Sequence, residues 1–154
     1  MKYLFFDTET TGLPKNWRAP ITQVDNWPRV VQLAWLLTDA NATEISSGNY
    51  IIKPEGFRIP IAAAKVHGIS TEKALEEGKD LKLVLQSFEQ AVQEADFLVA
   101  HNISFDYKVT AAELIRTAID GQAFHTISQI CTKEESTDYC QLPGRYGYKW
   151  PTLT

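Results

Sequence analysis

Two short runs of apolar residues, at positions 3–6 and 97–100, constrain the fold of this chain more than any other feature of its sequence. Runs without a polar residue are typical of strands that are buried on both faces. Each run is followed at once by polar residues, so each strand is expected to end in a loop there. The sequence therefore predicts two buried strands whose ends carry polar side chains.

The rest of the sequence predicts three further strands, two long helices and two short ones. A short turn joins the first two of these strands, which predicts an antiparallel hairpin. In the first long helix, apolar residues recur every three or four positions and Asp80 stands at the N-cap. This order predicts one α/β domain with a mixed sheet of about five strands flanked by helices. The three strands cover residues 30–38, 44–53 and 127–131, and the helices cover residues 61–66, 70–78, 81–95 and 103–119.

The chain contains four tryptophans, and their positions predict two different roles. Trp17 and Trp27 lie in an irregular segment over residues 14–29, where rings are able to stack on nucleic-acid bases. Packing of this long loop against the sheet is the interpretation we prefer. Trp35 and Trp150 are expected in the core or at its edge.

Charge and cysteine content exclude several classes of protein. The chain has 154 residues, with 15 Lys and Arg against 19 Asp and Glu, and a net charge of −4. This charge argues against a module that binds nucleic acid through a basic surface, unless bound cations supply the positive charge. Two cysteines make no disulfide framework. Asp7 interrupts the apolar N-terminus too early for a signal peptide or a membrane span, so a cytoplasmic location without a membrane is expected.

Asp7 and Glu9 are the first residues that indicate chemistry. Side chains two apart on a strand point to the same face, so the two carboxylates lie side by side and repel each other. A divalent cation such as Mg²⁺ or Mn²⁺ removes this penalty. The alternative is that Asp7 and Thr8 merely begin a turn.

Asp106 is the third candidate, in the first turn of the helix that follows the strand over residues 97–100. A carboxylate there is also favoured by the helix dipole alone. If this strand lies next to the first one, Asp106 reaches the same sheet edge as Asp7 and Glu9. Three convergent carboxylates predict a metal site.

The motifs resemble those of a known family. DTETTG at residues 7–12 resembles the first motif of the DEDD family of 3′–5′ exonucleases, and HNISFD at residues 101–106 resembles the second. VHGI at residues 66–69 is similar to the proofreading epsilon-subunit type of DNA polymerase III. The resemblance covers nearly the whole chain, with its motifs in order.

This resemblance implies a ribonuclease H-like fold and an enzyme that releases nucleoside monophosphates from single-stranded or frayed nucleic-acid 3′ ends. It also implies two divalent cations, Mg²⁺ or Mn²⁺, and a DNA polymerase subunit as a further partner. The implied catalytic residues and metal ligands are Asp7, Glu9 and Asp106. The implied substrate-binding residues are Thr8, Thr10, Thr11, Gly12, Leu13 and His67, although His67 has the alternative role of closing a short helix.

One part of the family pattern is absent from these 154 residues. The family carries a fourth carboxylate and a general base, written His-x₄-Asp or Tyr-x₃-Asp. After Asp106, only Asp120 and Asp138 are available, and neither is preceded by His or Tyr at the required spacing. The expectation is an exonuclease domain over residues 1–154 that is truncated at its C-terminus and weakly active or inactive. The alternative is a catalytically silent module of the same fold that binds nucleic acid or a polymerase.

Overall fold

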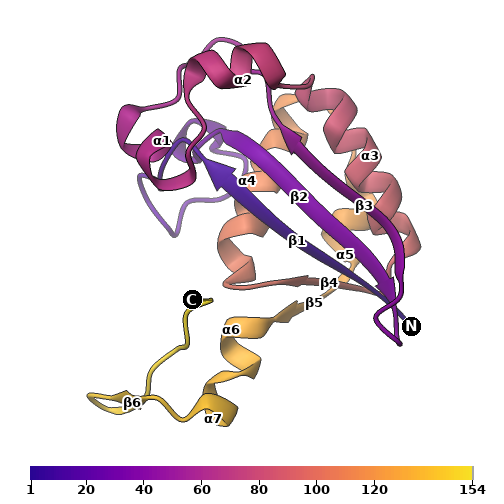
Figure 1. Cartoon of the computed structure of the whole chain (residues 1–154), viewed down its shortest axis with the longest axis vertical. Helices are drawn as coiled ribbons and strands as arrows, with labels where there is room; N and C mark the ends of the chain where they lie inside the picture. Colours follow the sequence, from indigo (N-terminus) through magenta and orange to yellow (C-terminus); the bar gives the residue numbers. More distant parts are fainter. Residues whose placement is uncertain (154) are drawn as a thin grey trace.

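The computed structural model describes residues 1–153 and contains a mixed five-stranded sheet with the strand order β3-β2-β1-β4-β5 (Figure 1). β1 pairs antiparallel with β2, and β2 with β3, whereas β1–β4 and β4–β5 are parallel pairs. The predicted mixed sheet and its hairpin are therefore confirmed. The strands are β1 (Lys2–Thr10), β2 (Val30–Asp39), β3 (Glu44–Ile51), β4 (Phe97–Ala100) and β5 (Ser128–Cys131).

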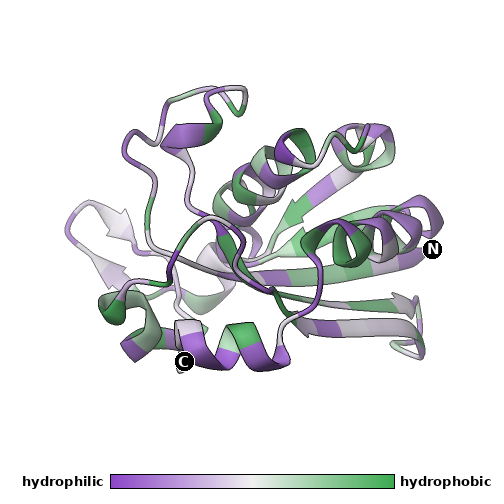
Figure 2. Ribbon diagram, turned by 90° about the horizontal axis from the view of Figure 1, so that it is seen from above, coloured by the Kyte–Doolittle hydropathy of each residue, from purple (hydrophilic) through white to green (hydrophobic). Residues whose placement is uncertain are grey.

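Three helices pack on one face of the sheet and enclose the core, which contains Leu4, Leu37 and Phe88. Figure 2 shows that single turns of these helices carry both hydrophobic and hydrophilic residues, as is typical of amphipathic helices. Asp80 caps α3 as predicted, since its side chain accepts a hydrogen bond from Leu83 N. The core helices are α3 (Leu81–Glu94), α4 (Ile103–Arg116) and α5 (Gln122–Thr126), and α1 (Ile61–His67) and α2 (Thr71–Glu77) precede them.

The opposite face of β1 is open, which corrects the prediction that residues 3–6 are buried on both faces. Leu4 and Phe6 are buried, but Phe5 is 42% exposed. This alternation of buried and exposed residues continues to the end of the strand. An apolar run does not distinguish a doubly covered strand from one whose outer face carries an exposed aromatic ring.

β1 is also longer than predicted. Residues 7–10 were expected to form a loop, yet their backbone pairs with β2, with Asp7 opposite Ala34 and Glu9 opposite Gln32. The ladder with β2 holds these polar residues extended. Asp7 and Glu9 are therefore fixed on the strand instead of in a turn.

A buried ion-pair network attaches the loop over residues 14–29 to α4. Glu113 Oε1 lies 2.9 Å from Arg29 Nε and 3.2 Å from Arg116 Nη1, and Glu113 is fully buried. Arg116 also donates to the carbonyl oxygen of Trp27. Trp27 is buried as predicted, but Trp17 is half exposed and lies against Phe105.

The C-terminal segment differs most from the sequence prediction. α4 ends three residues earlier than expected, at Arg116. Residues 132–148 form two short helices and a small hairpin, where only turns were predicted. Trp150 is 61% exposed and not part of the core. These elements are α6 (Thr132–Glu135), α7 (Thr137–Cys140), β6 (Pro143–Gly144) and β7 (Gly147–Tyr148), and one 3-10 turn, η1 (Val24–Asn26), lies earlier in the chain.

Within residues 1–153, none of the helices combines the length and the apolar character that crossing a membrane requires.

Candidate active site

The parallel pairing of β1 and β4 brings their C-terminal ends to the same edge of the sheet. Only two residues separate the end of β4 from the start of α4, and the first turn of α4 lies beside β1. α1 lies next to the other side of this edge (Figure 1). The two predicted carboxylate motifs therefore meet here, as the sequence predicts.

Asp106 contacts β1 directly. Its Oδ1 accepts hydrogen bonds from Thr8 N at 3.0 Å and from Thr8 Oγ1 at 2.7 Å. Only 4% of Asp106 is exposed. Burial and, to a smaller extent, the negative charge of Asp7 raise the pKa of Asp106 to about 6, although the two hydrogen bonds from Thr8 oppose this shift.

Asp7 and Glu9 lie on the opposite, open face of β1, since Thr8 between them points into the core. Burial raises the pKa of Asp7, while a backbone hydrogen bond from Thr8 and the charge of His101 lower it. Burial also raises the pKa of Glu9, and the charge of Asp7 adds to this effect. The two carboxylates are therefore neighbours that resist being ionised together.

This donor set suits a divalent cation in its chemistry, because two repelling carboxylates are what Mg²⁺ or Mn²⁺ stabilises. Across residues 1–153, however, no three His, Cys, Asp or Glu side chains are grouped closely enough to hold one ion. Asp106 reaches β1 from the helix side through Thr8, whereas Asp7 and Glu9 face the other way. The structure brings the three carboxylates to one sheet edge without gathering them into a preformed cluster.

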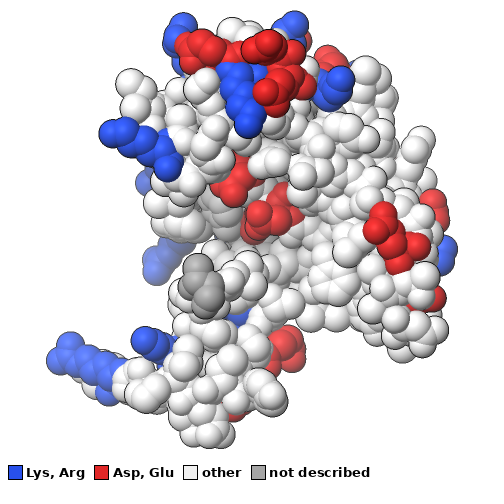
Figure 3. Space-filling view, in the orientation of Figure 1, with Lys and Arg blue, Asp and Glu red and all other residues white. Residues whose placement is uncertain are grey.

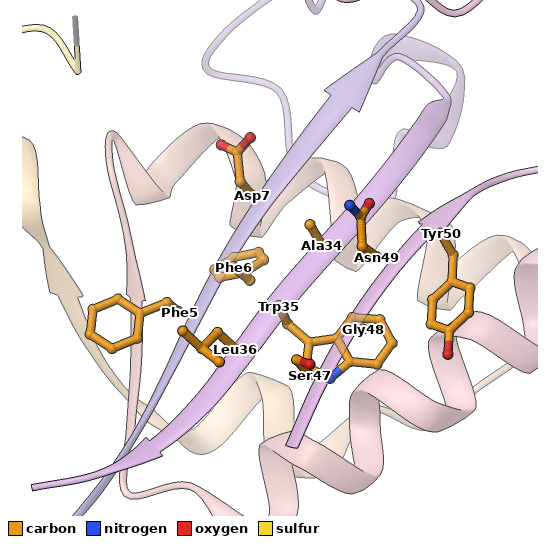
Figure 4. Close-up of a pocket in the computed structure, with 10 residues that line it drawn as sticks. All are labelled: Phe5, Phe6, Asp7, Ala34, Trp35, Leu36, Ser47, Gly48, Asn49 and Tyr50. Atoms are coloured by element: carbon orange, nitrogen blue, oxygen red, sulfur yellow. The ribbon is translucent and has the colours of Figure 1, made fainter. Parts of the chain in front are cut away.

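A hollow of about 590 Å³ extends from Asp7 along the open face of the sheet (Figure 4). Phe5 and Leu36 form its floor, and Asn49 and Tyr50 come from β3 at its far side. Because Ala34, the direct partner of Asp7 on β2, is small, the carboxylate of Asp7 projects freely from the strand. The open face therefore has room for a ligand beside Asp7.

The predicted substrate-binding turn follows β1. Thr10 Oγ1 donates to the carbonyl oxygen of Gly12 at 2.7 Å, and Thr11 N donates to the carbonyl oxygen of Arg29 at 2.9 Å. Gly12 has φ +147°, and a Cβ there would meet no atom within 4 Å. Leu13 is 72% exposed. The turn is held rigidly from inside and presents an apolar side chain outward.

His67 lies beside the carboxylates at the end of α1. Its Nδ1 accepts a hydrogen bond from Ile69 N, whereas its Nε2 is buried and has no hydrogen-bond partner within residues 1–153. The charge of His67 lowers the pKa of Glu9, so the ring lies near that carboxylate. His67 also closes the helix, since Gly68 follows it in the left-handed conformation. The helix-closing role of His67 is therefore observed, and its substrate role stays a prediction.

Residues 4–141 match the exonuclease (RNase_T) family. The chain belongs to this family. Exonuclease domains of this family use divalent metal ions. A comparison with curated proteins finds no matching sequence.

Solved structures of exonuclease I share the fold of this exonuclease domain. A product-bound exonuclease I has a TM-score of 0.74 and 21% identity over 92% of this chain. Escherichia coli exonuclease I in complex with a dA13 oligonucleotide has the same score and identity over 94% of the chain. A zinc-bound form of the E. coli enzyme with single-stranded DNA has a TM-score of 0.75 at 21% identity. The chain spans about a third of the length of these proteins, covering 32%, 31% and 30% of them. The fold predicted from the resemblance is thereby confirmed.

Two residues of the second motif were not among the predicted site residues. His101 lies close enough to Asp7 for its charge to lower the pKa of that carboxyl group. Its ring nitrogens bond to Thr132 Oγ1 and to the carbonyl oxygen of Pro151, each at 3.1 Å. Asn102 Oδ1 accepts from Lys133 Nζ at 2.7 Å. These residues connect the site of the exonuclease domain to its C-terminal segment, and the sequence signal for them was their place in the HNISFD motif directly after an apolar strand.

Proposed function

We propose that this chain is a metal-dependent 3′–5′ exonuclease domain that hydrolyses phosphodiester bonds at nucleic-acid 3′ ends and releases nucleoside monophosphates. The observation that carries the proposal is the placement of Asp7 and Glu9 as repelling neighbours on the open face of β1, beside the buried Asp106. Such a pair costs free energy unless a cation is bound. Membership of the exonuclease family supports the same chemistry.

In the proposed mechanism, Asp7 and Glu9 would hold divalent cations, with Mg²⁺ or Mn²⁺ as our prediction, and Asp106 would hold one directly or through water. When bound, such ions would supply Lewis-acid activation of a water molecule and charge stabilisation at the phosphate. Asp106 is also a positioning residue, since its bonds to Thr8 fix the strand between the two outer carboxylates. The turn over residues 10–12, exposed Leu13 and the His67 side chain would line the place of the terminal nucleotide.

The proposal includes low activity. No His-x₄-Asp or Tyr-x₃-Asp pattern follows Asp106 in these 154 residues. Loss of a general base alone typically lowers a rate by about 10²–10⁴-fold. We therefore expect slow turnover in Mn²⁺. The proofreading type of the resemblance further predicts a DNA polymerase subunit as partner.

A catalytically silent nucleic-acid-binding module is the second candidate. It is favoured by the absence of a preformed three-ligand cluster in residues 1–153. The two candidates differ in turnover, and both retain the fold.

The test is digestion of a 5′-labelled single-stranded oligonucleotide in Mn²⁺ by the wild type, Asp7→Ala and Asp138→Ala. Asp138 is an exposed acidic residue in α7 and is the matched control. A ladder that shortens from the 3′ end in the wild type and Asp138→Ala, but not in Asp7→Ala, supports the exonuclease. No ladder from any of the three contradicts it. A Mn²⁺-induced rise in melting temperature that Asp7→Ala abolishes, without a ladder, favours the silent module.

A further inference from the structure

The C-terminal segment combines exposed aromatic rings with positive charge, on a chain whose net charge is −4. We name residues 143–150, which contain β6 and β7, the tail hairpin. Its rings are unusually exposed: Tyr146 is 90%, Tyr148 is 52% and Trp150 is 61% exposed. Aromatic side chains normally bury their rings, so three exposed rings in five residues indicate a surface for a ligand.

Cations lie on or beside these rings. The guanidinium of Arg145 lies 5.2 Å from the ring centroid of Tyr146, and Lys133 Nζ lies 3.9 Å from that of Trp150. Lys149 adds a third positive charge, and residues 141–154 contain no acidic residue. Figure 3 shows Lys and Arg side chains gathered over the hairpin at the lower left, with no acidic side chain on its visible face.

The backbone of the tail hairpin fixes this arrangement. Pro143 pairs with Tyr148 and Gly144 with Gly147, which places Arg145 and Tyr146 at the tip. A Cβ on Gly144 would lie 2.7 Å from the carbonyl oxygen of Gly147, so the two strands approach as closely as they do only because glycine is there. The hairpin extends away from the sheet and its helices (Figure 1).

The base of the tail hairpin is attached to the candidate active site. The carbonyl oxygen of Pro151, one residue after Trp150, bonds to His101 Nε2. Lys133, which lies on the Trp150 ring, donates to Asn102. His101 in turn lies near Asp7. The exposed rings thus lead from the tip of the hairpin back to the edge of the sheet that carries the carboxylates.

We infer that the tail hairpin is a binding surface for single-stranded nucleic acid, on which bases stack against Tyr146, Tyr148 and Trp150 while Arg145, Lys149 and Lys133 contact phosphates. This inference rests on the proposed function, because it assigns to the tail hairpin the task of guiding a nucleic-acid strand toward the exonuclease site. Stacking on aromatic rings beside cations is how sequence-independent single-strand binding works. Unpaired bases fit this surface, because bases in a duplex have no free face to stack.

The test is the affinity of the whole chain for fluorescein-labelled oligothymidylate, measured by fluorescence anisotropy in excess EDTA so that no cleavage occurs. Tyr146→Ala and Trp150→Ala are each expected to weaken binding about tenfold. Tyr139→Ala is the matched control, because Tyr139 is also 90% exposed but lies in α7 outside the hairpin. Arg145→Gln is expected to make the slope of log affinity against log salt shallower by about 0.7.

Three results would overturn the inference: no binding by the wild type, unchanged binding by both hairpin variants, or an equal loss in Tyr139→Ala. Its failure is separable from that of the proposed function. Mn²⁺-dependent cleavage that Asp7→Ala abolishes, together with unchanged binding by the hairpin variants, removes only the inference. Weakened binding by the hairpin variants without any cleavage removes only the exonuclease activity.

Discussion

The ionised form of Asp106 is stabilised by its hydrogen bonds from Thr8 and destabilised by burial. Burial has the larger effect on the pKa of this side chain. That pKa rises from an ordinary 3.8 to about 6. The folded protein therefore holds this proton more tightly than the unfolded chain does. Stability contributed by the protonated form is present below pH 4 and is lost as the pH rises to about 6.

Asp106→Asn is expected to stabilise the protein above pH 6, because the amide oxygen still accepts both Thr8 bonds and carries no charge to bury. The gain in the free energy of unfolding at pH 8 is about 3 kcal/mol at most, and it disappears near pH 4. Urea denaturation at the two pH values measures it. Asp138→Asn, an exposed control, is expected to show no such difference. A loss of stability at pH 8 would show that the ionised carboxylate is the favoured state.

The sequence predicts where the candidate carboxylates lie on the strand and the helix, but it does not predict which residues they contact. Asp7 and Glu9 follow from their spacing of two on a strand, and the structure puts them on one face. The bond between Asp106 and Thr8 joins residues 98 apart in the chain, and no local pattern encodes such a contact. The place of Asp106 at this edge of the sheet was predictable, whereas its approach from the helix side was not.

Among the elements, α4 has a second role as the anchor of the loop over residues 14–29. Glu113 is fully buried and accepts from Arg29 Nε and Val30 N, each at 2.9 Å. The sequence gives no sign of this, since a glutamate in a helix is usually exposed. The buried charge explains why a loop with three prolines holds a fixed path against the core.

Glu113→Gln is expected to lower the free energy of unfolding by about 3 kcal/mol, because it leaves the charge of Arg116 without its buried partner. Chemical denaturation measures this loss. Glu76→Gln, at an exposed position of α2, is the control and is expected to change stability by less than about 0.5 kcal/mol. Limited proteolysis should cut the loop over residues 14–29 faster in Glu113→Gln. Equal stability of the two variants would mean that the network contributes nothing.

β1 and β4 were predictable because each contains a short run of apolar residues, and α3 was predictable because its apolar residues recur every three or four positions. α5 was missed because five residues are too few to show one. The tail hairpin has only two residues in each strand, and its exposed rings gave a false indication of burial at Trp150. Errors of this kind fall where local pattern is short and tertiary contacts decide the structure.

At the scale of the whole molecule, the sheet is covered on one face by α3, α4 and α5 and is open beside Asp7 on the other. Neighbouring leucines of β2 report on the two faces, since Leu37 is fully buried and Leu36 is 36% exposed. Leu37→Asn is expected to lower the free energy of unfolding by about 3–5 kcal/mol, because it removes core packing and buries an amide. Leu36→Asn is expected to cost less than about 1 kcal/mol. Urea denaturation of the two variants compares the same chemical change on opposite faces of one strand.

The size of the Leu36 effect has a direct functional consequence. A small loss in the free energy of unfolding in Leu36→Asn means that the hollow beside Asp7 stays open to solvent in the isolated chain. A nucleic-acid end is then free to approach the carboxylates from that side. A cost equal to that of Leu37→Asn would mean that something covers the open face in solution, such as a second copy of the chain. Repeating the Leu36→Asn measurement at several protein concentrations identifies that case, because association makes stability depend on concentration. The accessible face that the proposed nuclease needs would then have to form by dissociation before any substrate binds.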